Sequence, residues 1–190
     1  MSGSTKTVVQ PDNFVFTSEN AEAANVEIVK YPEGWQESAV MPLLDLAQRQ
    51  HDGWLPRAAM DTVAEMLGMA PIRVYEVATF YTMYNLVPVG KFHVQVCGTT
   101  PCWLRGSDEI MERCKARGMA KGHTTDDGLW TLTEVECMGN CATAPMVQIN
   151  DGNYEDLTPE RLDAVLDALA AGKQPKEGTP EPGRHTSEPS

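Results

Sequence analysis

The residues best suited to chemistry in this 190-residue sequence are four cysteines arranged as two close pairs. The first pair is Cys97-x4-Cys102 and the second is Cys137-x3-Cys141, with 34 residues between the pairs. Thiolates are soft ligands, and a set of four sulfurs is typical of a zinc ion or an iron–sulfur cluster. A metal or cluster site is therefore the first hypothesis that the sequence raises.

The loops that carry the cysteines favour a cluster over zinc. Residues 98–101 and 138–140 both contain glycine, which lets backbone N–H groups approach sulfur and stabilise a negatively charged cluster. Cys102 also precedes an expected helix, whose N-terminal dipole favours a thiolate. Zinc remains open because four-cysteine zinc sites use similar spacings, and a disulfide or inert buried thiols also remain open.

Other candidate groups point to less chemistry. Cys114 stands in the middle of an expected helix with no cysteine or histidine at ligand spacing, so we interpret it as structural. Glu134 and Glu136 lie close to Cys137 on an expected solvated strand face, where their charge would lower a cluster potential. The sequence contains no nucleotide-binding glycine motif and no C-x-x-C, which weighs against a thiol–disulfide enzyme.

Two strands are expected to position the cysteine pairs. Residues 92–96 and 130–135 alternate between apolar and polar side chains, and each segment leads directly into one pair. If these strands are parallel neighbours, all four thiols converge on one edge of a sheet. The order strand, helix, strand, strand, helix predicts a small α/β layer, with these further elements: helix 103–117, polar loop 119–127, strand 146–149, a return at 154–155 and a helix capped by Thr158.

The first half of the sequence predicts a small helical bundle. Apolar residues recur at helical spacing in several short segments, the last being 71–84, with its Val74, Tyr75, Ala78, Tyr81 and Met83 expected to be largely buried. We expect four consecutive parts along the chain: an extended arm (1–16), the bundle (17–87), the α/β domain (88–171) and a proline-rich tail (172–190) that is disordered or loosely docked.

Charge weighs against two classes of partner. The sequence has 15 basic and 27 acidic residues, a formal net charge of −12. Residues 1–90 and 91–171 each contribute −6, while residues 172–190 are neutral. A general nucleic-acid binder and a polybasic membrane-surface protein are therefore disfavoured classes. We also expect no transmembrane helix, since no run of about 18 apolar residues occurs, and no secretory signal, since the N-terminal residues contain no apolar h-region.

Four segments together resemble one known family. CGTTPCWLRGS (97–107) and ECMGNCATAPMVQIND (136–151) are similar to the paired-cysteine segments of the thioredoxin-like [2Fe–2S] subunit of NADH:quinone oxidoreductase, respiratory complex I. GWLPRAAMDTVAEMLGM (53–69) and RVYEVATFYTMYNL (73–86) resemble that family's helical segment. The resemblance covers about residues 30–170, and the tail after residue 171 falls outside it.

The resemblance implies a specific site and role. It implies a helical bundle followed by a thioredoxin-like domain, and one [2Fe–2S] cluster held by Cys97, Cys102, Cys137 and Cys141. The cluster would accept an electron from reduced FMN in a partner flavoprotein subunit that also carries the NADH site. A large iron–sulfur subunit would be a second partner. This chain alone would hold no complete active site.

The same resemblance leaves the host complex open. Related subunits occur in NAD-linked hydrogenases and formate dehydrogenases, and a zinc-stapled structural module is the alternative from a different class. For complex I, the implied location is the cytoplasmic side of the bacterial inner membrane, bound peripherally as part of a membrane complex. A processed eukaryotic chain would lie on the mitochondrial matrix side.

Overall fold

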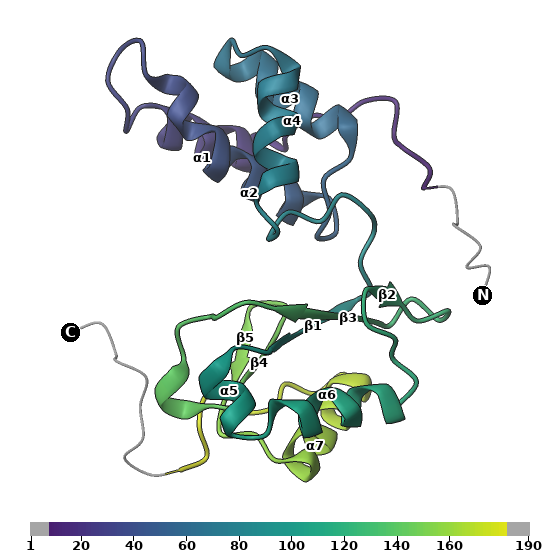
Figure 1. The fold of residues 1–190 in the computed structure, drawn as a ribbon. Coiled ribbons are helices and arrows are strands. Elements are labelled where there is room, and N and C mark those ends of the chain that lie inside the picture. Colours follow the sequence, from purple (N-terminus) through teal and green to yellow (C-terminus); the bar gives the residue numbers. More distant parts are fainter. Residues whose placement is uncertain (1–7, 182–190) are drawn as a thin grey trace. The chain divides into compact units, whose positions relative to one another are not determined.

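The computed structural model describes residues 8–181. The chain forms two compact units, Met1–Pro88 and Val89–Ser190 (Figure 1). The described part of the first unit is built from helices. The second unit is a five-stranded sheet with helices packed against it. A helical unit followed by an α/β unit is the fold class that the sequence predicted.

The helical unit packs short amphipathic helices around one apolar core. Its elements are α1 (Ser18–Ile28), the short 3-10 helix η1 (Gln36–Ala39), α2 (Val40–Gln50), α3 (Arg57–Leu67) and α4 (Pro71–Phe80). Thr17 caps α1 by accepting a hydrogen bond from the Asn20 N–H, and α3 ends at Gly68 in the left-handed conformation. Leu43 and Leu44 of α2 and Val63 of α3 are fully buried, as the apolar spacing predicted.

The last helix of this unit is shorter than predicted. α4 ends at Phe80, and Tyr81 is already extended. Tyr81 and Met83 are 41% and 52% exposed, so the expectation that they are buried is wrong. The chain turns here to bury Tyr84, whose hydroxyl donates to the Met41 carbonyl oxygen at 3.0 Å.

The second unit places the two cysteine-bearing strands side by side. The sheet order is β2-β3-β1-β4-β5, and its strands are β1 (Phe92–Cys97), β2 (His123–Thr124), β3 (Trp130–Val135), β4 (Val147–Ile149) and β5 (Gly152–Tyr154). β1 and β3 are parallel, with Val94 opposite Leu132. The other neighbouring pairs are antiparallel.

Helices pack on one face of this sheet (Figure 1). They are α5 (Thr100–Leu104), α6 (Ser107–Ala116) and α7 (Pro159–Ala170), and the 3-10 helix η2 (Cys141–Thr143) lies in the second cysteine loop. Val94, Leu132, Ile110 and Leu166 meet in the core between sheet and helices. Among residues 8–181, no helix is both long and apolar enough to cross a membrane.

Two predicted elements of this unit need correction. The single helix expected over 103–117 is two helices, because Gly106 adopts the left-handed conformation at φ +93° and separates α5 from α6. The loop expected over 119–127 contains β2, which pairs with β3 and places His123 opposite Leu132. A strand of two exposed residues has no alternation that a sequence pattern could show.

The arm and the tail make specific contacts where the structure describes them. In the arm, the Phe14 carbonyl oxygen accepts a hydrogen bond from the Thr62 hydroxyl at 2.9 Å, and Phe16 is buried. In the tail, Gly178 forms a parallel bridge with Tyr154 of β5. Residues 1–7 of the predicted arm and 182–190 of the predicted tail lie outside the described residues.

Candidate metal centre

Parallel pairing of β1 and β3 brings the two cysteine loops to one edge of the sheet. Cys97 is the last residue of β1 and stands opposite Val135, the last residue of β3. The N–H of Gly98 donates to the Val135 carbonyl oxygen at 3.2 Å, which continues the pairing into the loops. The parallel pairing of the two strands, on which the expected convergence depends, is confirmed.

The two pairs differ in burial. Cys97 and Cys102 are 2% and 1% exposed and pack against Ala144 and Met146. Cys137 and Cys141 are exposed, and their sulfur atoms lie 3.4 Å apart. The site therefore has an inner pair anchored in apolar packing and an outer pair at the protein surface.

The first cysteine of each pair accepts hydrogen bonds that favour the thiolate. Burial alone would raise the pKa of Cys97, but hydrogen bonds from the Thr99 hydroxyl and backbone hold it below its ordinary value. The Thr99 oxygen lies 3.3 Å from the Cys97 sulfur. The Gly139 N–H, 3.5 Å from the Cys137 sulfur, is the main cause of the lowered pKa of Cys137. Thr99 also helps to lower the pKa of Cys137, so it acts on a cysteine of each pair.

The second cysteine of each pair holds its proton more tightly. Burial raises the pKa of Cys102 to about 11, with Cys97 and Cys141 adding repulsion. The hydrogen bond to Cys137 raises the pKa of Cys141, and the charges of Cys137 and Cys97 add to it. A cationic metal centre would release these protons, because thiolates are the ligand form of cysteine.

This donor set fits a two-iron centre. Such a cluster takes four thiolates, two on each iron, and the structure supplies two pairs that interact with each other. Across residues 8–181, no group of three or more His, Cys, Asp or Glu side chains stands in a ready metal-binding arrangement, so the fit rests on the chemistry of the four thiols. Backbone and hydroxyl donors that point at sulfur, from Gly139 and Thr99, are the contacts that stabilise a negative cluster.

A charged pair beside the site was not apparent from the sequence. Lys121 forms an ion pair with Glu134, and both line a pocket of about 390 Å³ next to Gly98 and Thr99. A Cβ atom on Gly98 would lie 2.5 Å from the Glu134 carboxylate, so glycine allows this close approach. Lys121 comes from a loop whose sequence shows no periodic pattern, and only the tertiary structure brings it to Glu134.

Cys114 stands apart from this site. It is fully buried on α6, in the core cluster that contains Val94 and Leu166. Burial is the main cause that raises its pKa to about 12. A thiol with this pKa stays protonated at neutral pH and packs as a small apolar group.

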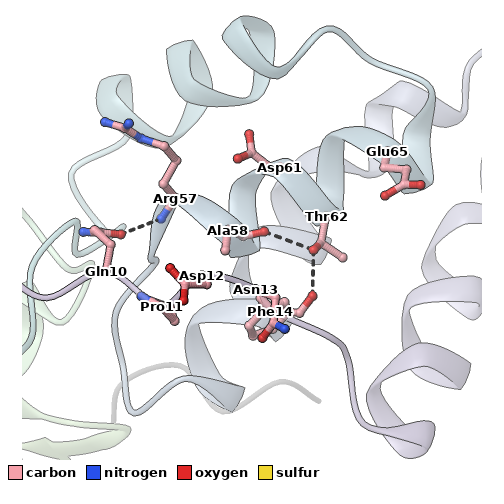
Figure 2. Close-up of a pocket in the computed structure, with 10 residues that line it drawn as sticks. All are labelled: Gln10, Pro11, Asp12, Asn13, Phe14, Arg57, Ala58, Asp61, Thr62 and Glu65. Carbon is pink, nitrogen blue, oxygen red and sulfur yellow. Dashed lines mark hydrogen bonds between the residues drawn. The ribbon is translucent and has the colours of Figure 1, made fainter.

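The helical unit has a pocket of its own, without cysteines. It has a volume of about 380 Å³ and lies between the arm and α3 (Figure 2). The Gln10 side-chain oxygen accepts from the Arg57 N–H at 2.9 Å, and Thr62 donates to the carbonyl oxygens of Phe14 and Ala58. These hydrogen bonds attach the arm to α3.

Comparison with known proteins decides the family. The model of the thioredoxin-like [2Fe-2S] ferredoxin family matches residues 24–170. The chain belongs to this family. The matched range includes both cysteine pairs and most of the helical unit, so the family resemblance noted from the four sequence segments is confirmed.

Relatives with known names indicate which proteins of the family this chain is similar to. The chain is 57% identical over 158 residues to the E subunit of NADH-quinone oxidoreductase from Rickettsia bellii (strain RML369-C), an alignment that covers 83% of this chain and 95% of that protein. It is 55% identical over 168 residues to the first E subunit of NADH-quinone oxidoreductase from Rhizobium meliloti (strain 1021), covering 87% of this chain and 60% of that protein.

A solved structure shows the same fold at lower identity. It is from an NAD+-reducing [NiFe]-hydrogenase in the air-oxidized state, with a TM-score of 0.59 and 21% sequence identity. The match covers 68% of this chain and 23% of that chain. At this identity, the likeness concerns the fold alone.

Proposed function

We propose that this chain is the electron-transfer subunit of the NADH dehydrogenase module of NADH-quinone oxidoreductase. It holds one [2Fe–2S] cluster through Cys97, Cys102, Cys137 and Cys141, and receives an electron from reduced FMN in a partner flavoprotein subunit. The observation that carries the proposal is the parallel β1–β3 pair, which brings two cysteine pairs to one sheet edge in a chain of the [2Fe-2S] family.

The four cysteines have two different tasks in this role. The inner pair, Cys97 and Cys102, fixes the centre to the sheet through buried packing. The outer pair, Cys137 and Cys141, leaves one side of the centre at the surface, where a partner can approach. When bound, the cluster supplies a one-electron redox couple. The chain supplies distance, orientation and the surrounding charge.

The surrounding groups set how readily the site takes an electron. Donors from Thr99 and Gly139 stabilise added negative charge at sulfur. Residues 91–171 carry a net charge of −6, which opposes it. Lys121 offsets the carboxylate closest to Gly98. We infer a low reduction potential, because the opposing charges outnumber the donors.

The names of the relatives favour NADH-quinone oxidoreductase as the host over a hydrogenase, since they are named subunits of that complex at 57% and 55% identity. We infer two partners there, the FMN- and NADH-binding flavoprotein subunit and a large iron–sulfur subunit. The corresponding location that we infer is the cytoplasmic side of the bacterial inner membrane, bound peripherally as part of a membrane complex.

The test is reduction by NADH through the partner. The full chain is produced together with its flavoprotein subunit, NADH is added without oxygen, and electron paramagnetic resonance follows the reduced cluster. We expect a signal that is absent when Cys97→Ser replaces the native chain and retained with Cys114→Ser. The proposed role is wrong if dithionite reduces the cluster, the reduction potential of the cluster lies within the reach of NADH, and NADH with the flavoprotein still does not reduce it.

A further inference from the structure

The proline-rich tail binds the open edge of the sheet. β5 is the last strand in the sheet order, and Gly178 forms a parallel bridge with its Tyr154. The Gly178 N–H donates to the Asn153 carbonyl oxygen at 2.7 Å, and the Gly178 carbonyl oxygen accepts from the Glu155 N–H at 3.3 Å. We call residues 177–179 the C-terminal strap.

Side chains strengthen this attachment on both sides of the bridge. One guanidinium nitrogen of Arg161 donates to the Gly178 carbonyl oxygen at 2.6 Å, and another donates to the Glu155 carbonyl oxygen. The Thr179 hydroxyl donates to the Asp156 carboxylate at 2.5 Å. Gly178 has a φ of +75°, a conformation that disfavours any residue with a side chain. The strap is thus tied to residues 155 and 156 by several polar contacts.

Residues 155–157, which the strap contacts, also support the loop of Cys137 and Cys141. The Asp156 N–H donates to the Thr143 carbonyl oxygen at 2.7 Å, and the Leu157 N–H donates to the Pro145 carbonyl oxygen at 3.0 Å. Thr143 is fully buried and directly follows the loop of the outer pair. Residues 155–157 therefore lie between the strap and the loop.

A buried carboxylate completes the connection. Glu155 is only 5% exposed, and its carboxylate accepts a hydrogen bond from the Asn140 side-chain nitrogen at 2.8 Å. Asn140 stands directly before Cys141. Its carbonyl oxygen accepts in turn from the Thr143 N–H at 3.2 Å. Movement of Glu155 would break the contact that holds this loop from within the fold.

We propose that the C-terminal strap is a positioning element for the metal centre. By fixing residues 155–157, it holds the loop of Cys137 and Cys141 in one arrangement. The matched family range ends at residue 170, before the strap begins. The part of this inference that concerns the cluster rests on the proposed function, whereas the part that concerns the loop does not.

The test compares the full chain with two truncated variants, one that ends at Glu181 and one that ends at Gly172. Hydrogen exchange of the Thr143, Asp156 and Leu157 amides is measured without metal, and the rate of cluster loss to a chelator is measured after loading. We expect the variant that ends at Gly172 to exchange and to lose its cluster at least about fivefold faster, the factor for roughly one lost hydrogen bond. The variant that ends at Glu181 is the matched control and should behave as the full chain.

Two further arms separate positioning from general loosening. In the variant that ends at Gly172, the amides of β1 and β3 should keep their exchange rates. In an Asn140→Ala background, the same truncation should add little to the rate of cluster loss, because both changes act on the same contact. Thr179→Val removes one strap contact without shortening the chain and should accelerate exchange at Asp156.

The proposed role of the strap is wrong if the Thr143, Asp156 and Leu157 amides keep their exchange rates in the variant that ends at Gly172 and in Thr179→Val. It is also wrong if all amides of the second unit exchange faster by the same factor in these two variants. Failure of the full chain to hold a [2Fe–2S] cluster would instead contradict the proposed function and leave the exchange result valid.

Discussion

The hydroxyl of Thr99 offers a sharp test of how the protein tunes its metal centre. It lies 3.3 Å from the Cys97 sulfur and also helps to lower the pKa of Cys137. Thr99→Val keeps the shape of the side chain and removes this donor. Because added charge on sulfur strengthens such a bond, we assign it roughly 1 kcal/mol of preference for the reduced state, the size of a typical net hydrogen bond.

That free energy converts directly into a potential. For a one-electron couple, 59 mV corresponds to a tenfold change, or about 1.4 kcal/mol, so roughly 1 kcal/mol is about 40 mV. We expect Thr99→Val to make the reduction potential about 40 mV more negative in a titration followed by electron paramagnetic resonance.

Thr100→Val is the matched control for this measurement. Thr100 is the next residue, is exposed, and should leave the potential within the error of the titration. A cluster-loaded Thr99→Val chain with an unchanged or more positive potential would refute the idea that this hydroxyl stabilises the reduced site.

Three further predictions test the site and its scaffold. Cys114→Ser should keep the visible absorption of the cluster while Cys141→Ser loses or alters it, because Cys114 lies in the core away from the cysteine loops. Loss of the visible absorption in Cys114→Ser would contradict the ligand set. Leu132→Ala should lower the free energy of unfolding by about 2–5 kcal/mol in denaturant titrations, since this buried side chain fills the space between sheet and helices; a loss below about 1 kcal/mol would argue against the packing. Burial lowers the pKa of His93, so the unfolded chain binds a proton at this residue more readily than the folded chain. The free energy of unfolding should therefore fall as pH drops below about 6.5. His93→Gln should flatten this dependence, and an unaltered profile of stability against pH would contradict the prediction.

The sequence predicted the two strands that carry the cysteine loops because their signal is local. Alternating residues at 92–96 and 130–135 indicate strands, and a cysteine at or just beyond each strand end places the thiols at its carboxyl end. Parallel pairing of β1 and β3 then needed only a helical crossover between them. Cys97 and Cys137 follow from this reasoning without any tertiary information.

Element ends were harder to predict because tertiary contacts decide them. Tyr81 leaves the helix although the apolar spacing continues, since burial of Tyr84 redirects the chain. Gly106 breaks one expected helix into two, and a lone glycine inside a helical pattern does not by itself indicate a break.

The tail shows the limit of reasoning from composition. Residues 172–190 contain no large apolar side chain, which correctly indicates that they cannot build a core. Gly178 and Thr179 nevertheless bind through backbone and hydroxyl hydrogen bonds to a free sheet edge, and such binding needs no apolar surface. Lys121 went unassigned for a similar reason, because its partner Glu134 lies on another segment.

Our central inference is that four cysteines of this protein hold a two-iron cluster that takes up one electron. The most direct measurement is metal analysis of the purified full-length protein together with electron paramagnetic resonance after dithionite reduction. We predict about two iron and two sulfide per molecule and a signal from one unpaired electron that appears only on reduction. A colourless protein with one zinc ion and no signal would contradict this inference.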